Sequence, residues 1–200
     1  SDIDIKDVTK PYANPIIFLL LGGFIIAQGL EKSSLHKRIA LRILLYLGSN
    51  KENILKGFII STSFLSMWLS NTATCLLMLP IAVSILDKVK LDNDFKKILF
   101  LSIAYSSSIG GMGTLIGTAP NAILAGYLSE NFNLELSFFN WMLFSLPLVF
   151  ILLFLLWTYF KIFIPKSHND LLSENIIKNQ YEDLGRILIK EKIALFIIIL

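Results

Sequence analysis

Hydrophobic residues are gathered into five stretches that contain no Asp, Glu, Lys or Arg. These stretches cover residues 11–30, 57–86, 98–129, 136–160 and 193–200, with lengths of 20, 30, 32, 25 and 8 residues. A helix that crosses a bilayer needs roughly 20 mostly apolar residues. The pattern therefore predicts an all-α polytopic membrane protein. Because the last stretch is too short to span, we expect the chain to be an internal piece of a longer protein, cut inside a helix.

Several segments have simple patterns. Residues 11–30 and 136–160 have the length of single spans, with Pro147 as a kink in the second. Within residues 33–48 a hydrophobic residue recurs every four positions opposite basic ones, which indicates a helix at the cytoplasmic interface. Charges also recur every four residues over 170–190, which predicts one amphipathic cytoplasmic helix with favourable Glu174–Lys178 and Glu182–Arg186 pairs.

The basic residues fix the expected topology. Residues 31–56, 87–97 and 161–192 hold six, four and six Lys or Arg, whereas residues 130–135 hold none. Because Lys and Arg remain preferentially on the cytoplasmic side, the first three segments are expected inside, and the N-terminus and 130–135 outside. The net charge of +3 then reflects topology and not a nucleic-acid partner.

The 30-residue stretch 57–86 has both ends inside on this count. It breaks at Ser70-Asn71-Thr72 into arms of about 13 and 14 residues, each about 20 Å long, while the hydrocarbon core is about 30 Å thick. Two full spans are therefore excluded. One span is disfavoured because it would place the lysines of 87–97 outside. We expect a re-entrant helical hairpin that enters from the cytoplasm.

The 32-residue stretch 98–129 has its ends on opposite sides. Its middle, residues 110–120, contains four Gly and one Pro, which do not form a continuous helix. We expect a broken helix, with one half reaching about Ile109, an unwound loop, and a second half starting near Asn121.

Both interruptions are rich in neutral oxygens and lack charge. Irregular backbone at membrane depth is tolerated only where protein buries it or where it lines a wet cavity. Hydroxyls, amides and carbonyls suit a hard cation such as sodium, and half-helix N-termini attract anions. Discontinuous helices of this kind mark the binding sites of secondary transporters. Back-bonding Ser or Thr, or glycines for close helix packing, would explain either feature alone, but the two together favour a site.

Other chemistries find little support in the sequence. The single cysteine, Cys75, excludes a disulfide framework or a cysteine-based metal site within the chain. No nucleophile–base pair or phosphate-binding loop is present, so no catalytic residues and no cofactor are expected. A membrane-embedded enzyme or a structural subunit remains the alternative of a different class. The two interruptions contain no ionisable residue that an enzyme of this kind would need.

Ser70-Asn71-Thr72 at a hairpin tip resembles the SNT signature of the divalent anion/sodium symporter family, within the ion transporter superfamily. Gly117-Thr118-Ala119-Pro120-Asn121 resembles the second motif of that family, although Ala119 stands where many members have a second Pro. The order of segments is similar along essentially the whole chain. The resemblance implies the N-terminal half of an inverted-repeat elevator transporter, whose second hairpin has no counterpart here.

The resemblance also implies site residues. The first sodium ion would be bound by Ser66, Ser70, Asn71 and the Gly117 carbonyl. The anionic substrate would meet Asn71, Thr72 and Thr118, and the supporting loop would include Gly113, Pro120 and Asn121. The implied units are a scaffold span with its interfacial helix (11–48), the hairpin (51–90) and broken helix (95–130) of a transport domain, a span (136–164), an amphipathic cytoplasmic helix (166–190) and the start of a further span (191–200).

The function implied is sodium-coupled import of dicarboxylate, tricarboxylate or sulfate anions by an elevator mechanism. Its partners would be sodium, the small anion, the lipid bilayer and a second copy in a homodimer, in the inner (plasma) membrane. An anion exchanger, a sodium/proton antiporter or an arsenite exporter on the same fold is the alternative.

Overall fold

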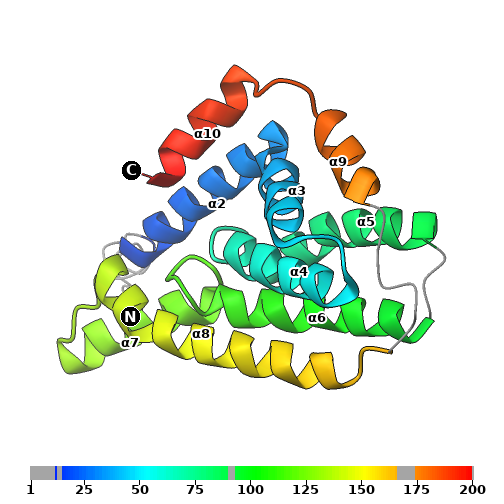
Figure 1. Ribbon diagram of the computed structural model, residues 1–200. Coiled ribbons are helices and arrows are strands. Elements are labelled where there is room, and N and C mark those ends of the chain that lie inside the picture. The colour runs from blue at the N-terminus through cyan, green and yellow to red at the C-terminus, as the bar shows by residue number, and fades with distance from the viewer. Residues whose placement is uncertain (1–11, 13–14, 90–92, 166–173, 200) are drawn as a thin grey trace, which may run out of the picture.

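The computed structural model describes residues 12, 15–89, 93–165 and 174–199. This part of the chain is helical and contains no strand (Figure 1). The helices are α2 (Pro15–Ser33), α3 (Leu35–Leu47), α4 (Lys51–Ser66), α5 (Asn71–Val89), α6 (Asn93–Gly111), α7 (Ala119–Phe132), α8 (Phe138–Ile162), α9 (Glu174–Glu182) and α10 (Ile189–Ile199). Residues 1–10, which we expect on the outer side, are not among the described residues. The same holds for the connections at 90–92 and 166–173.

Local signals explain where several helices begin and end. Ser34 takes a left-handed conformation, with φ of 62°, and separates α2 from α3. Helix α3 ends at Gly48, whose φ of 100° lies outside the helical range. Glycine is suited to this position because a residue with a side chain would be strained there. The Asn50 side chain then accepts the Asn53 N–H at 2.7 Å and caps α4. Ser137 caps α8 in the same way through the Asn140 N–H, at 3.1 Å.

Helix α6 lies at the centre of the fold. It packs against α4, α5 and α8, and Figure 1 shows it running between α4 and α8. Fully buried apolar side chains fill these contacts, among them Phe58 on α4, Ile85 on α5 and Phe95 and Leu99 on α6. Both hairpin helices, α4 and α5, and the first half of the broken element, α6, are therefore assembled around a shared core.

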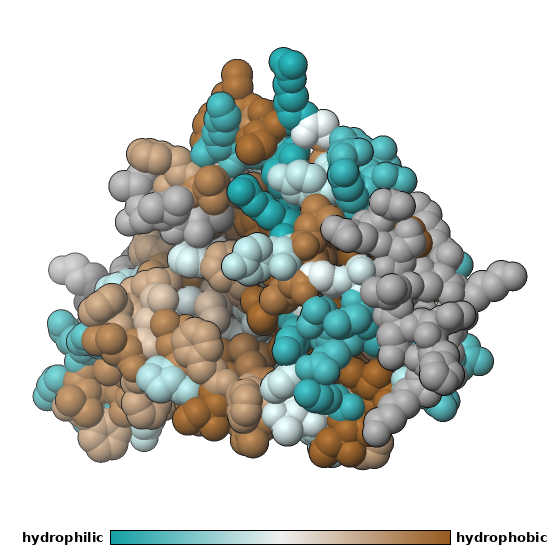
Figure 2. Space-filling model, viewed as in Figure 1, coloured by the Kyte–Doolittle hydropathy of each residue, from teal (hydrophilic) through white to brown (hydrophobic). Residues whose placement is uncertain are grey.

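Two of the described helices, α2 and α8, are long and apolar enough to cross a membrane. Large hydrophobic side chains on their surfaces are exposed, as are those of α7. In Figure 2 hydrophobic side chains dominate the lower left, over α7 and α8, and hydrophilic side chains gather at the top and right, around α9 and the start of α10. This separation is typical of a protein that faces both lipid and water.

The helix boundaries differ from expectation in three places. The hairpin turn occupies residues 67–70, so Asn71 and Thr72 already lie in the first turn of α5. The arms contain 16 and 19 residues and extend past the charge-free stretch. The break in the second element runs from the end of α6 at Gly111 to the start of α7 at Ala119.

The single amphipathic helix predicted over 170–190 is wrong for its C-terminal part. Helix α9 ends at Glu182, and Gly185 has a left-handed φ of 64°, which stops the helix. The predicted helical pair Glu182–Arg186 therefore does not form on this helix, and Lys178 instead approaches Glu182, with 4.0 Å between Nζ and Oε1. The prediction followed the spacing of the charged residues and did not consider Gly185, which lies less than one helical turn after Glu182.

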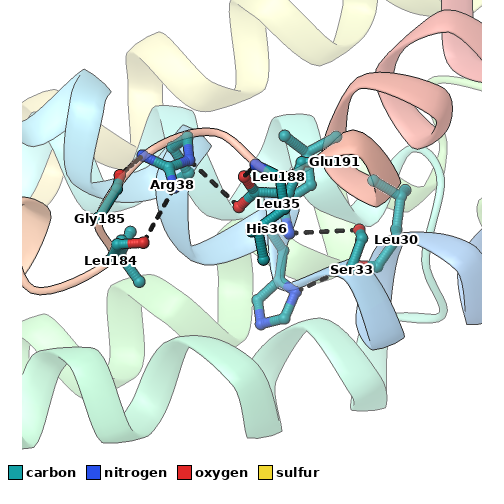
Figure 3. A network of polar contacts seen from close by, with 9 residues as sticks. All are labelled: Leu30, Ser33, Leu35, His36, Arg38, Leu184, Gly185, Leu188 and Glu191. Carbon is teal, nitrogen blue, oxygen red and sulfur yellow. Dashed lines mark hydrogen bonds and ion pairs between the residues drawn. The ribbon is translucent and has the colours of Figure 1, made fainter.

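A buried ion pair anchors helix α3 to the C-terminal segment (Figure 3). Arg38 Nε donates to Glu191 Oε1 at 3.1 Å, and both side chains are buried. The other guanidinium nitrogens of Arg38 donate to the carbonyls of Gly185 at 3.1 Å and Leu184 at 3.3 Å. Glu191 Oε2 accepts the Leu188 N–H at 2.8 Å. The charges of Arg38 and Glu191 thus pair with each other and are further satisfied by backbone groups, as the burial of an ion pair requires.

Glycines allow the closest helix contacts. A Cβ on Gly57 would lie 2.6 Å from Leu44 Cδ2, and one on Gly110 would overlap the backbone of Ser63 on α4. A Cβ on Gly23 would lie 2.9 Å from Ile116 Cβ, whereas Gly22 and Gly29 have nothing within 4 Å in the described structure. Packing therefore requires glycine at 110, where the contact is with backbone, and favours it at 23 and 57, where the contact is with a side chain.

Gly110→Ala should destabilise the protein, because the added methyl group forces α6 away from the α4 backbone. Overpacking of this kind costs about 1–3 kcal/mol. The melting temperature of the detergent-solubilised full-length protein measures the effect. Gly22→Ala is the matched control on an open helix surface. Equal melting temperatures for the two variants would contradict the packing described.

Acidification should destabilise the protein partly through His36. Burial is the largest influence on the pKa of His36 and lowers it below the ordinary 6.5, although the bond to the Leu30 carbonyl opposes this. The neutral ring is favoured in the fold, so the stabilisation is complete above the ordinary pKa and is lost as pH falls below it. His36→Gln should therefore show a smaller drop in melting temperature between about pH 7.5 and 5 than the unmodified protein. Identical drops would show that His36 does not contribute.

Candidate functional site

The turn between α4 and α5 places four predicted site residues next to one another. Ser66 ends α4 and is fully buried. Ser70 is exposed and precedes α5, where its Oγ accepts the Ala73 N–H at 3.3 Å. Asn71 and Thr72 form the first turn of α5, the first half-buried and the second exposed. The turn thus exposes carbonyl groups at the end of one helix and N–H groups at the start of the next.

Ser66 and Asn71 are in direct contact across this turn. The Ser66 hydroxyl donates to Asn71 Oδ1 at 2.8 Å. Both atoms are neutral oxygens, and a cation that touches one of them is within reach of the other. Two residues that the family resemblance assigns to one site are therefore hydrogen-bonded to each other.

The glycine loop at residues 112–118 packs onto the same turn. Gly111 lies so close to Asn71 that a Cβ would overlap its Oδ1. A Cβ on Gly117 would lie 3.0 Å from the Ser66 carbonyl oxygen. The structure therefore brings Gly117 together with Ser66, and Asn71 together with the end of α6. Only residues without side chains fit at these two positions.

Two of the residues predicted to support the loop make defined contacts. Asn121 Nδ2 donates to the Gly111 carbonyl at 2.9 Å and to the Thr114 carbonyl at 2.8 Å, and so closes the loop across its base. Gly113 is buried, and a Cβ there would lie 3.1 Å from Met67 Cε. Pro120 is exposed in the first turn of α7, where its missing N–H has no helical partner to lose.

The predicted anion-binding residues lie at helix N-termini. Thr118 is the half-buried N-cap residue of α7, with extended backbone and no capping bond from its own side chain. Thr72 lies in the exposed first turn of α5. Each position combines a hydroxyl with the positive end of a helix dipole, which favours an anion.

Sequence reasoning missed three residues that hold the loop in place. Thr114, which is fully buried, binds both the hairpin turn and the loop. From α8, the Ser145 hydroxyl donates to the Gly113 carbonyl at 2.9 Å, and Trp141 Nε1 donates to the Met112 carbonyl at 3.0 Å. Ser145 was detectable as a buried polar residue in an otherwise apolar span, but its partner was not.

The site is electrically neutral. Residues 66–74 and 111–121 contain no Asp, Glu, Lys, Arg or His. Within the described residues no cluster of His, Cys, Asp and Glu could hold a metal ion. Any charge that binds here would therefore interact with oxygens, N–H groups and helix dipoles alone. Oxygens of this kind suit an alkali cation, and the N–H groups suit an anion.

Residues 1–200 match the protein family described as CitMHS, citrate transporter. The sodium-dependent dicarboxylate transporter SdcS of Staphylococcus saprophyticus is 40% identical over 207 residues, which include 98% of this chain and 40% of that protein. SdcS proteins of Staphylococcus aureus strains USA300 and NCTC 8325 are 38% identical over the same shares. The chain therefore spans about two fifths of the length of these relatives. It belongs to the CitMHS citrate transporter family, whose members transport substrates and are not enzymes.

Proposed function

We propose that this chain supplies half of the binding site of a sodium-coupled secondary transporter that imports dicarboxylate anions. The observation that carries the proposal is the contact between the two helix breaks, which places Ser66, Asn71 and Gly117 in one charge-free cluster. The SdcS relatives are named sodium-dependent dicarboxylate transporters, which supports both the ion and the cargo.

Sodium would bind to oxygens of the hairpin turn and the glycine loop. Ser66 Oγ and Asn71 Oδ1 already lie 2.8 Å apart, and the Gly117 backbone packs against the Ser66 carbonyl. Ser70 would contribute its hydroxyl from the turn. These ligands are neutral, so the ion would keep its full charge and attract an anion bound beside it.

The substrate carboxylate would bind at the N-termini of α5 and α7. Asn71 and Thr72 would approach it from the first helix, and Thr118 from the second, with N–H groups of both helices as donors. Tricarboxylate or sulfate would suit the same donors, and the citrate transporter description of the family favours a tricarboxylate as the second candidate cargo. Exchange, sodium/proton antiport or arsenite export would use the same fold with different coupling.

The membrane arrangement is part of the proposal. Helices α4 and α5 would form a re-entrant hairpin from the cytoplasm, and α6 and α7 would form a broken transmembrane helix, both in a transport domain. That domain would move as an elevator against a scaffold that includes α2, in a homodimer in the plasma membrane. The N-terminus would face outward, as the distribution of basic residues predicts.

Asn71→Ala and Thr72→Ala in the full-length protein should each lower sodium-dependent succinate uptake at least about tenfold, the effect of losing one strong polar ligand. Uptake into proteoliposomes with sodium or potassium outside measures the effect, and equal reconstitution is checked by immunoblot. Asn131→Ala and Thr158→Ala are the matched controls, because these residues are exposed and bond only within their own helices.

Uptake by the unmodified protein that is equal in sodium and potassium would contradict the sodium coupling. Normal sodium-dependent uptake by both site variants would instead contradict the assigned residues. Replacing succinate with citrate or sulfate in the same vesicles identifies the cargo.

A further inference from the structure

Thr114 connects the two helix breaks through one hydroxyl group. It lies in the middle of the glycine loop and is fully buried. Its Oγ1 donates a hydrogen bond to the carbonyl of Met67 in the hairpin turn. The same oxygen accepts the N–H of Gly117 at 3.0 Å. A hydroxyl has one donor hydrogen and two acceptor lone pairs, so it can make both bonds at once.

The two partners of this hydroxyl are groups that helix ends leave without partners. Met67 follows the last residue of α4, where carbonyls have no partner further along the helix. Gly117 lies in the loop just before α7. An unpaired polar group buried in an apolar region is costly, so the Thr114 hydroxyl stabilises both interruptions together.

Thr114 does not make the hydrogen bond that is usual for a hydroxyl group in a membrane helix. Such hydroxyls bond to a carbonyl three or four residues earlier in their own helix, as Ser102, Ser106 and Thr158 do here. The acceptor for Thr114 is 47 residues away in the sequence, in the other interrupted element. Its hydrogen bond therefore crosses between elements.

Thr114 is itself held in place through its backbone. Asn121 Nδ2 donates to the Thr114 carbonyl at 2.8 Å and to the Gly111 carbonyl at 2.9 Å. The side chain of Thr114 thus faces the hairpin turn and Gly117, while its carbonyl is fixed to the start of α7. Little rotation is possible at this residue without breaking several bonds.

We propose that Thr114 is a positioning residue for the sodium site, and that its hydroxyl fixes the backbone at Gly117 against Ser66 and Asn71 so that turn and loop move as one unit. This inference rests on the proposed function, because it assigns Thr114 to the same cation site. Thr114 acts through Gly117 and Met67 and is not itself a ligand.

The test uses sodium-specific thermal stabilisation of the purified full-length protein. A ligand that binds only the folded state stabilises it by RT ln(1 + [L]/Kd), so the melting temperature rises with the logarithm of the ligand concentration above Kd. Melting curves are recorded over a sodium series at constant ionic strength, with potassium as the replacement ion. Thr114→Val removes the hydroxyl at nearly constant volume, Thr114→Ser retains it, and Thr158→Val is the control at an exposed hydroxyl.

Thr114→Val should weaken the apparent sodium affinity about tenfold or more, while Thr114→Ser and Thr158→Val remain within about threefold of the unmodified protein. If Thr114→Val does not fold, Thr114→Ala removes the same hydroxyl without added bulk and takes its place. A merely structural role would lower the melting temperature equally in sodium and potassium and leave the sodium affinity unchanged, which would overturn the proposal. Equal weakening by Thr114→Ser would overturn it as well, because the hydroxyl would then not be the cause.

These outcomes are distinct from failure of the proposed function. If the unmodified protein shows no stabilisation by sodium over potassium, the sodium site itself is contradicted. If it shows stabilisation and Thr114→Val retains it, only the role of Thr114 is contradicted.

Discussion

An unpaired backbone N–H or carbonyl in an apolar environment costs several kcal/mol, and this fold contains two helix interruptions that create such groups. The structure resolves the problem by placing the interruptions against each other. Thr114 pairs groups from both, Asn121 closes the base of the loop, and Ser145 and Trp141 on α8 satisfy two further loop carbonyls. Helix α6, which leads into the glycine loop, lies between α4 and α8 (Figure 1).

The same constraint explains the composition of the site. Contact between two irregular backbones leaves no room for side chains at Gly111 and Gly117, and α6 can approach α4 only because residue 110 is glycine. The polar positions carry small hydroxyls and amides: Thr114 and Asn121 bond to backbone carbonyls, and Ser66 bonds to Asn71. In the proposed site, the residues that stabilise the breaks would therefore also bind the ion, which is the arrangement expected of a transporter with discontinuous helices.

The sequence predicted the first break because the basic residues place both ends of a 30-residue charge-free stretch inside. It predicted the second because four glycines and a proline lie within residues 110–120. The hydrogen bond between Ser66 and Asn71 was not predicted from their spacing, because only the family resemblance assigned both residues to one site. The sequence could not predict the partner of Thr114, since a 47-residue separation carries no periodic signal. The end of α9 at Glu182 was missed because one glycine, Gly185, outweighed a regular charge pattern.

The most direct measurement of the central claim is a structure of the full-length protein determined by electron cryo-microscopy in saturating sodium and again in potassium. If the two interruptions form one sodium site, cation density appears in sodium alone, about 2.3–2.6 Å from Asn71 Oδ1 and from the Gly117 carbonyl oxygen, the distances typical of a hard cation of this size. A well-ordered turn and loop without such density in saturating sodium, or with density at another place, would contradict the claim that the two interruptions form one sodium site.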